Sequence, residues 1–176
     1  TGCCTASDSE DARKVASKLD IPYYVLDYTE SFSKNVVDNF IDMYAQGLTP
    51  NPCVECNRSV KFDHFLNQAK KLNCEKVATG HYAKIIKNEN FYELHKADYL
   101  DKDQSYVLHM LKSDDLENIL FPLGEITKPE VRQIAARLGL KTAFKKDSQD
   151  ICFVGKKDYR SFVEKRIDLT SAGEIF

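Results

Sequence analysis

Apolar residues recur along this chain at intervals of three and four, the spacing that places side chains on one face of a helix. The pairs Ser7–Glu10 and Thr127–Glu130 have the spacing of a capping box at a helix start. Gly47 and Gly139 come where helical patterns end. Helices are therefore predicted at residues 7–19, 36–44, 62–72, 106–111, 128–138 and 158–163.

Short runs rich in β-branched and aromatic residues lie between these helices. Runs at 23–26, 76–79 and 151–154 predict buried strands, and 83–86 with 91–94 predict a β-hairpin. Strands that alternate with helices indicate an α/β fold with a parallel sheet covered on both faces.

Gly80 follows the predicted strand 76–79 directly. Ligands of such folds bind at the carboxyl ends of the strands, where a glycine lets a nucleotide approach the backbone closely. An ordinary turn glycine explains the residue equally well at this stage.

A proline-rich stretch, Thr49 to Asn57, separates two of the predicted helices. Pro50 and Pro52 remove two backbone donors and disfavour helical geometry at the residues before them, so an exposed, stiff loop is predicted. This loop carries Cys53 and Cys56 in a C-x-x-C spacing. Because a thiolate is both a nucleophile and a soft metal ligand, the spacing indicates chemistry or coordination before packing.

Composition narrows the class of protein. The chain has 176 residues, 43% hydrophobic and 30% charged, without tryptophan, which is typical of one globular domain or one domain with a fragment of another. No apolar run is long enough to cross a membrane and no signal peptide is recognisable, so a cytoplasmic protein is expected. The formal net charge is −2, so a nucleic-acid partner would need a local basic face.

Six cysteines in a Lys- and Glu-rich, helix-patterned chain point to reactive thiols in a reducing compartment. A four-cysteine zinc knuckle would need a second C-x-x-C, which the chain lacks. A thioredoxin-like redox site would have its C-x-x-C directly after a strand, without prolines such as Pro50 and Pro52 in front of it. Cys152, between Ile151 and Phe153, is on these neighbours alone either a small buried hydrophobe or a functional thiol.

Four segments together, with their order and spacing, resemble the bacterial tRNA-specific 2-thiouridylases. They are Asn51-Pro52-Cys53-Val54-Glu55-Cys56-Asn57, Ala78-Thr79-Gly80-His81-Tyr82-Ala83, Asp101-Lys102-Asp103-Gln104-Ser105-Tyr106 and Lys145-Lys146-Asp147-Ser148-Gln149-Asp150-Ile151-Cys152-Phe153. Phe121-Pro122-Leu123-Gly124 resembles a further element of that family. The resemblance runs from about Cys3 to about Val163.

The resemblance implies an adenine-nucleotide α-hydrolase-like, Rossmann-like α/β domain over residues 1–165, with residues 166–176 leading into a following domain. It implies thiolation of the wobble uridine in tRNAs for Lys, Glu and Gln. ATP with magnesium would adenylate the uracil 2-oxygen, and sulfur from a relay protein would replace it. Cys152 would carry the persulfide, and Cys56 would free the sulfur through a transient disulfide between them.

The same resemblance assigns binding roles. Gly80 would lie against ATP. The target base would be bordered by Asn51, Pro52 and Cys53, because base chemistry requires an extruded nucleotide. The tRNA would be contacted by Lys102, Asp103 and Gln104, and we add Lys145 and Lys146 as candidate phosphate contacts, although a solvated surface pair is the commoner role of such lysines.

Two departures from the family pattern matter. Many members have Asp where this chain has Cys53, so an iron-sulfur cluster on Cys53, Cys56 and Cys152 is an alternative to persulfide chemistry, and so is a non-catalytic thiol or metal-binding module. The Ser-Gly-Gly-x-Asp-Ser loop that cradles pyrophosphate and the carboxyl-terminal β-barrel are absent from the sequence. We therefore expect the chain alone to be inactive.

Overall fold

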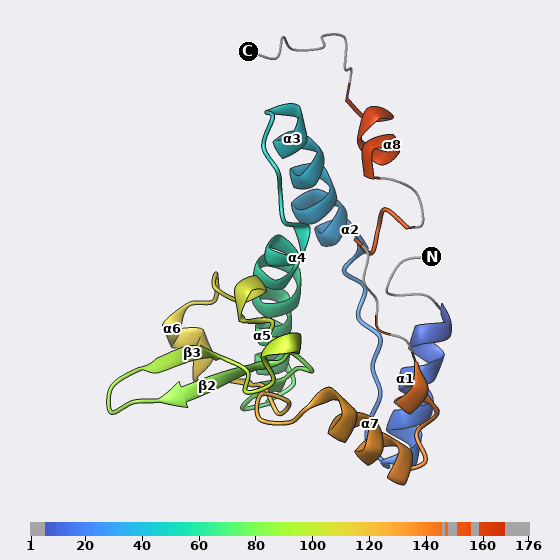
Figure 1. Ribbon diagram of the computed structural model, residues 1–176, viewed down its shortest axis with the longest axis vertical. Coiled ribbons are helices and arrows are strands. Elements are labelled where there is room, and N and C mark those ends of the chain that lie inside the picture. Colours follow the sequence, from blue (N-terminus) through green and yellow to red (C-terminus); the bar gives the residue numbers. More distant parts are fainter. Residues whose placement is uncertain (1–5, 146, 148–150, 156–158, 168–176) are drawn as a thin grey trace. The chain divides into compact units, whose positions relative to one another are not determined.

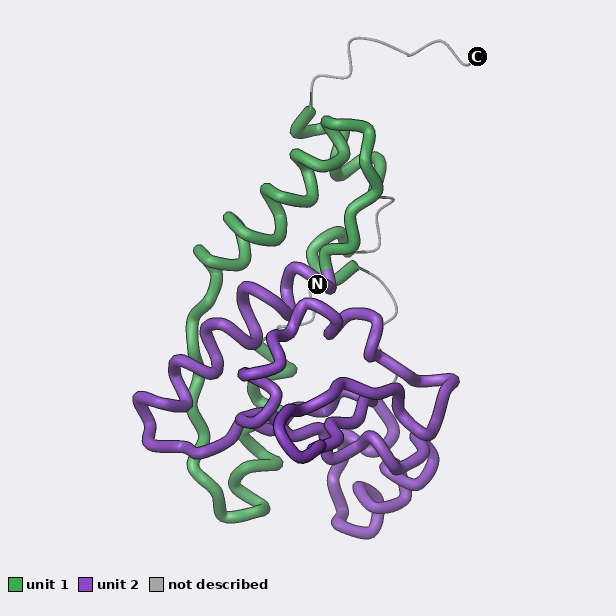
Figure 2. Tube along the Cα trace, turned by 90° about the vertical axis from the view of Figure 1, so that its left-hand side faces the viewer, with its two compact units in different colours: residues 1–52, 147–176 green, residues 53–146 purple. Residues whose placement is uncertain are grey.

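A computed structural model of the chain describes residues 6–145, 147, 151–155 and 159–167 (Figure 1). The chain divides into two compact units, one of residues 1–52 with 147–176 and one of residues 53–146 (Figure 2). The predicted change of domain after residue 165 stays a prediction, and Ser171 to Gly173, where we expect a linker, lie outside the described residues.

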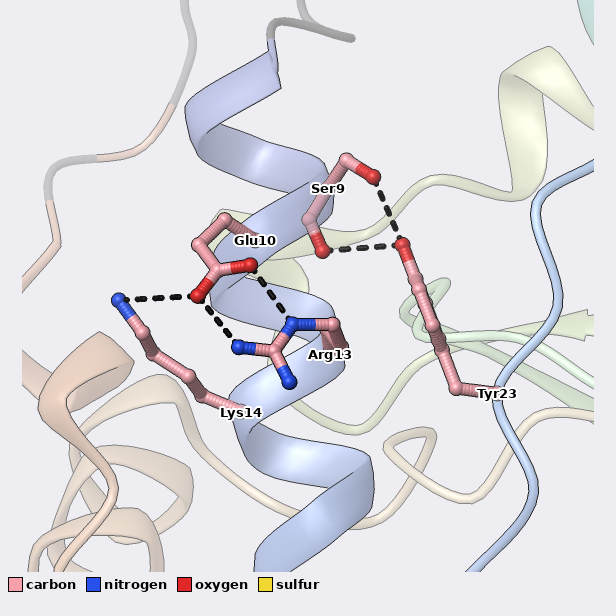
Figure 3. A network of polar contacts seen from close by, with 5 residues as sticks. All are labelled: Ser9, Glu10, Arg13, Lys14 and Tyr23. Carbon is pink, nitrogen blue, oxygen red and sulfur yellow. Dashed lines mark hydrogen bonds and ion pairs between the residues drawn. The ribbon is translucent and has the colours of Figure 1, made fainter.

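The first unit opens with helix α1, Ala6–Lys18. Ser7 lies inside this helix, so the capping box predicted for Ser7 and Glu10 is wrong. Glu10 instead pairs along the helix surface: Nε and one terminal nitrogen of Arg13 each donate to its carboxylate at 2.7 Å, and Lys14 lies 3.5 Å away (Figure 3). The Arg13 hydrogen bond lowers the pKa of Glu10 to about 2.

The strand predicted at residues 23–26 is wrong. Tyr24 and Val25 are 67% and 71% exposed, and no described residue pairs with this stretch as a neighbouring strand would. Tyr23 contacts helix α1, because its hydroxyl donates to the Ser9 carbonyl at 2.9 Å and lies 2.8 Å from the Ser9 hydroxyl (Figure 3). A β-rich sequence does not form a strand without a partner for its backbone groups.

The predicted helices of the first unit are confirmed. Helix α2, Thr29–Phe32, a π-helical segment, Ser33–Asp38, and helix α3, Asn39–Ala45, follow one another without a break, and Gly47 ends the run with φ +74°. Helix α8, Tyr159–Glu164, lies near the end of the chain. The strand predicted at residues 151–154 is wrong, since residues 152–155 form turns.

The cysteine-bearing stretch is helical, so the loop predicted from Thr49 to Asn57 is wrong beyond Asn51. Helix α4, Pro52–Glu55, continues through a π-helical segment, Cys56–Phe62, into helix α5, Asp63–Lys71 (Figure 1). Pro52 is the first residue of this helix, where the missing N–H would have no intrahelical partner in any case. The prolines therefore mark where the helix begins.

The second unit contains both sheets found among the described residues. Strand β1, Val77–Ala78, pairs in parallel with β4, Ile119–Leu120, so the predicted α/β fold is confirmed although β4 was not anticipated. Strands β2, Ala83–Lys87, and β3, Tyr92–Lys96, form the predicted antiparallel hairpin.

Short helices connect or follow these strands. They are the 3-10 turns Leu100–Lys102 and Ser105–Val107, helix α6, Ser113–Leu116, helix α7, Lys128–Arg137, and the 3-10 turn Lys141–Phe144. Only a 3-10 turn stands where a helix was predicted at 106–111. The capping box at α7 is confirmed: Glu130 N donates to the Thr127 hydroxyl oxygen, and the Glu130 carboxylate accepts from Thr127 N at 2.9 Å.

One apolar core holds the second unit together. It consists of Phe62, Leu66, Ala69, Val77, Ala83, Val107, Leu108, Ile119 and Phe121. The helix, the strands and the connecting turns all contribute residues to this core. Packing in the core therefore holds the segments that follow the strands. None of the described helices has both the length and the apolar character that a bilayer span requires.

Candidate functional site

The segment Gly80 to Tyr82 leaves the carboxyl end of β1, the position where parallel sheets bind ligands. Thr79 N donates to the Leu120 carbonyl at 3.1 Å and extends the pairing with β4 by one residue. Gly80 is exposed, and a Cβ added to it would meet Leu123 Cδ1 at 3.8 Å, an ordinary contact. The backbone here is open to a ligand, and a methyl group could be added without strain inside the protein.

His81 points into the core, with only 8% of the residue exposed. Its ring lies 5.9 Å from both Phe62 and Phe121, measured between ring centroids, and Nδ1 lies 2.8 Å from the Thr79 hydroxyl. Burial, with a smaller contribution from the charge of Lys61, lowers the pKa of His81 to about 4. The imidazole is therefore neutral at physiological pH.

Acid should destabilise the protein through His81. Unfolding returns the ring to its ordinary pKa of 6.5. Between pH 6.5 and about 4, the ring is therefore protonated in the unfolded state and neutral in the folded state. Stability is then lost as pH falls through this window, by about 2 kcal/mol. Urea unfolding of the full-length protein at pH 7 and pH 4.5 measures the loss, and His81→Gln should remove this part of it.

His109→Gln is the matched control, because His109 is exposed and its ring lies 2.8 Å from the Tyr106 carbonyl in a surface turn. It should leave the pH dependence as in the wild type. An NMR signal of His81 that titrates near pH 6.5 in the folded protein would contradict the prediction.

Two residues assigned to tRNA by the resemblance hydrogen-bond to the protein backbone. Gln104 Oε1 accepts from Tyr82 N at 3.1 Å, and Asp103 Oδ1 accepts from Ala97 N at 2.9 Å. Lys102, in the preceding 3-10 turn, is half-buried. The segment 101–105 thus lies directly beside the segment that carries Gly80.

The Phe121 to Gly124 segment also packs against this region. Gly124 lies so close to β2 that an added Cβ would stand 2.2 Å from the Ala83 carbonyl oxygen. Lys128, at the start of α7, places its ammonium 5.8 Å from the Tyr82 ring centroid. Within the second unit, the structure therefore brings together three segments that carry the family resemblance.

Cys53 and Cys56 lie in the first turns of the helix that begins at Pro52. Residues three apart on a helix are surface neighbours, so both thiols belong to one face. Cys53 is exposed and Cys56 half-buried. Glu55, between them, accepts two hydrogen bonds from one Arg58 nitrogen at 2.8 and 3.0 Å, which fixes the polar side of this turn. Asn51, just before the helix, is exposed, whereas Pro52 is buried.

Cys152 belongs to the first unit and is half-buried in the turn at residues 152–155. The neighbouring Phe153 anchors this turn in an aromatic cluster, with ring centroids 5.8 Å from Phe32, 5.3 Å from Phe40 and 5.4 Å from Phe162. Gly155 closes the turn with φ +70°. Packing by Phe153 therefore holds the thiol in place.

The placement of Cys56 relative to Cys152 stays a prediction, because the two thiols belong to different units. Lys145 is exposed, and its carbonyl accepts from an Arg132 nitrogen at 3.4 Å. Lys146 and residues 148–150 lie outside the described part of the chain. Within neither unit do three or more described His, Cys, Asp or Glu side chains gather as metal ligands would.

Sequence reasoning missed the residues that support the site. Phe62 and Phe121 cover His81, and Phe153 anchors the Cys152 turn, yet an aromatic residue in an apolar pattern carries no sign of such a role. Asn57 was named only as part of a motif. It is 2% exposed, and its side-chain oxygen has no hydrogen-bond partner among the described residues.

Comparison of the sequence with known proteins places the chain in a family. Residues 1–156 match the sequence family described as the tRNA methyl transferase HUP domain. The chain is 49% identical over 164 residues to the tRNA-specific 2-thiouridylase MnmA of Leptospira interrogans serogroup Icterohaemorrhagiae serovar copenhageni (strain Fiocruz L1-130), covering 93% of this chain and 44% of that protein. It is 48% identical over 174 residues to the protein of the same name from Rickettsia peacockii (strain Rustic), covering 98% and 48%.

A third relative of that name, from Symbiobacterium thermophilum, is 50% identical over 169 residues, covering 94% of this chain and 43% of the relative. The chain thus spans less than half the length of these curated relatives. The match to a HUP domain confirms the predicted adenine-nucleotide α-hydrolase-like fold and the resemblance drawn from the four motifs. With 156 of its 176 residues matched, this chain belongs to the family of the tRNA methyl transferase HUP domain.

Proposed function

We propose that the full-length protein is a tRNA-uridine 2-sulfurtransferase that makes 2-thiouridine at the wobble position. The observation that carries this proposal is the identity of about half of all positions, over nearly the whole chain, to relatives named tRNA-specific 2-thiouridylase. The meeting of the Gly80, Gln104 and Gly124 segments beside the parallel strands supports it, because this is where the fold class binds nucleotides. The reaction takes place in the cytoplasm, where its tRNA substrate is found.

The first step uses ATP, accompanied by magnesium, as a substrate. The uracil 2-oxygen attacks the α-phosphorus, pyrophosphate leaves, and the 2-oxygen becomes part of a good leaving group. Gly80 contributes an exposed backbone at the carboxyl end of β1, and this geometry fits a nucleotide that approaches without a side chain in its way. The neutral, buried His81 keeps the segment apolar on its inner side.

The second step replaces oxygen by sulfur. Cys152 carries a persulfide received from a sulfur-relay protein. The Cys56 thiolate attacks the Cys152 sulfur and displaces hydrosulfide, so that a Cys56–Cys152 disulfide forms. Hydrosulfide then attacks C2 of the uracil and AMP leaves. A thiol reductant restores both cysteines. Cys56 and Cys152 are both half-buried, so each thiol is partly accessible to a reaction partner.

The tRNA substrates are those for Lys, Glu and Gln. Asn51, Pro52 and Cys53 border the extruded uracil, and Lys102 with Asp103 lies toward the tRNA. Lys145, which is exposed and contacts Arg132 of α7, adds a charge that a phosphate can use.

An iron-sulfur enzyme is the alternative that one observation favours. Cys53 and Cys56 lie on the same helix face, which is how two of three thiolate ligands would be presented, with Cys152 as the third. Such a protein would be brown after anaerobic purification and would lose activity in air. A module that only binds zinc through Cys53 and Cys56 would contain stoichiometric metal and no thiolation activity.

Mass spectrometry of the wobble nucleoside tests the proposal. The full-length protein is incubated with tRNA for Glu, ATP, magnesium and a persulfide donor, and a gain of sulfur in place of oxygen is the expected result. No gain of sulfur in the presence of every substrate would overturn it, whether or not pyrophosphate is released.

Gly80→Ala should weaken the use of ATP without weakening the protein. The new methyl group would stand on the exposed face of the backbone, where the nucleotide approaches, and would meet only Leu123 Cδ1 at 3.8 Å inside the protein. We expect the KM for ATP in pyrophosphate release to rise about tenfold, with an unchanged melting temperature. An unchanged KM would remove Gly80 from the nucleotide site.

A further inference from the structure

Gln104 binds both backbone groups of Tyr82. Its side-chain Oε1 accepts from Tyr82 N at 3.1 Å, and its own backbone N donates to the Tyr82 carbonyl at 2.8 Å. These two bonds pair segments that lie 22 residues apart in the sequence. In a sheet, a neighbouring strand would satisfy the backbone N–H and carbonyl of Tyr82. Here the Gln104 side chain satisfies the N–H, and the Gln104 backbone satisfies the carbonyl.

Hydrogen bonds of neighbouring residues hold the segment that carries Gln104 in place. The Asp103 carboxylate accepts from Ala97 N at 2.9 Å with one oxygen and from the Ser105 hydroxyl at 2.7 Å with the other. Asp98, two residues after the end of β3, donates its N–H to the Gly124 carbonyl at 2.9 Å. The segment that presents Gln104 is therefore tied to the end of the hairpin on one side.

The segment that receives Gln104 is held at its other end as well. Thr79 N bonds to the Leu120 carbonyl at 3.1 Å, and the Thr79 hydroxyl bonds to the His81 ring at 2.8 Å. Between these two points of attachment lies Gly80, exposed and without a side chain to fix it. A glycine has the largest backbone freedom of all residues, so its position depends on what holds its neighbours.

We propose that Gln104 is a positioning residue, whose side-chain oxygen fixes the Gly80–Tyr82 segment in the conformation that receives the nucleotide. This inference rests on the proposed function, which places Gly80 against ATP. It differs from the tRNA contact that the family resemblance implies for Gln104, because the amide oxygen is bonded to the protein's own backbone. Loss of a positioning residue of this kind would raise the KM for ATP, whereas loss of a tRNA contact would raise the KM for tRNA.

Two substitutions separate these roles in the full-length protein. Gln104→Met keeps the length of the side chain and removes the acceptor, whereas Gln104→Glu keeps an oxygen for Tyr82 N and adds a negative charge. We expect Gln104→Met to raise the KM for ATP about fivefold at unchanged kcat, the value of one neutral hydrogen bond. Gln104→Glu should restore the KM for ATP to within about twofold of the wild type.

Gln133→Met is the control, since Gln133 is exposed on α7 and undergoes the same chemical change away from the segment. It should leave the KM for ATP unaltered. If Gln104→Met and Gln104→Glu both raise the KM for tRNA and leave that for ATP unchanged, Gln104 contacts tRNA and the inference is overturned.

Hydrogen exchange provides a readout that does not need activity. Mass spectrometry of peptides covering residues 79–85 should show faster exchange in Gln104→Met than in the wild type, and wild-type exchange in Gln104→Glu. If the segment is released in Gln104→Met while the KM for ATP stays the same, the pairing is structural only and the inference fails. If the wild-type protein neither releases pyrophosphate nor gains sulfur on tRNA, the proposed function fails, whatever the exchange rates are.

Discussion

Gly124→Ala should destabilise the protein by about 3 kcal/mol, the upper part of the range for overpacking a well-filled site. An added Cβ would stand 2.2 Å from the Ala83 carbonyl oxygen, 2.6 Å from Lys84 Cγ and 3.0 Å from the Ala83 carbonyl carbon. Two of these atoms belong to the backbone of β2, and Ala83 is completely buried. Neither can move aside as the end of a flexible side chain could.

The segment that carries Gly124 would have to withdraw from the hairpin. Withdrawal breaks the 2.9 Å bond from Asp98 N to the Gly124 carbonyl and shifts Phe121, which belongs to the core and covers His81. Thermal unfolding of the full-length protein should show a midpoint lower by about 6–12 °C for a domain of this size. Hydrogen exchange should locate the loss in residues 83–98.

Gly80→Ala is the matched control for stability, since it makes the same chemical change one strand away. Its Cβ meets only Leu123 Cδ1 at 3.8 Å, so the midpoint should stay within about 2 °C of the wild type. Equal losses in the two variants would mean that glycine flexibility, and not the close approach of Gly124 to β2, matters in this region.

The parts of the fold that could be predicted are those set by local sequence. Thr127 and Glu130 cap α7 as their spacing indicates, because both partners of a capping box lie within one turn. Gly47 and Gly139 adopt positive φ where helical patterns end. The hairpin of β2 and β3 depends on two neighbouring runs and a short turn, so it too could be read from the sequence.

Two of the errors concern elements that need a distant partner. Residues 23–26 and 151–154 have the composition of strands, but the first is exposed and the second forms a turn anchored by Phe153. Residue composition describes what fits a sheet and not whether a neighbouring strand is present. The helix that begins at Pro52 was missed for the opposite reason, since a proline that ends one helix can equally begin another.

The candidate site divides in the same way. Motifs identified Gly80, Gln104 and the cysteines, because each has a distinctive residue type. They did not reveal that Gln104 pairs with Tyr82, or that His81 is neutral among aromatic rings, because those properties arise from residues 19 to 40 positions apart that meet only in the fold.

Cys152→Ser should abolish sulfur transfer while leaving the ATP step intact. A serine hydroxyl cannot form a persulfide, so 2-thiouridine formation by the full-length protein should fall by at least about a thousandfold, as expected when a covalent intermediate is lost. In the proposed mechanism, pyrophosphate release with tRNA and ATP does not use the thiol, so it should continue. Cys56→Ser should lose 2-thiouridine equally but retain the persulfide on Cys152, which mass spectrometry of the protein detects.

Cys74→Ser controls for the general effect of removing a thiol, because Cys74 is exposed just after α5 and its sulfur lies 3.9 Å from the Leu72 carbonyl oxygen. It should thiolate tRNA like the wild type. Loss of pyrophosphate release in Cys152→Ser to the same degree as loss of thiolation would refute the separation into two steps.

Cys53→Asp then distinguishes the persulfide route from the iron-sulfur route. This substitution installs the residue that many family members carry, beside an unchanged Cys56 on the same helix face. The persulfide route uses Cys56 and Cys152, so 2-thiouridine should still form and the protein should contain no iron in either version. A cluster needs three thiolates, so its iron, its colour and its activity would fall together in Cys53→Asp. Iron analysis after anaerobic purification, paired with nucleoside mass spectrometry, therefore decides whether Cys53 is a ligand of an iron-sulfur cluster.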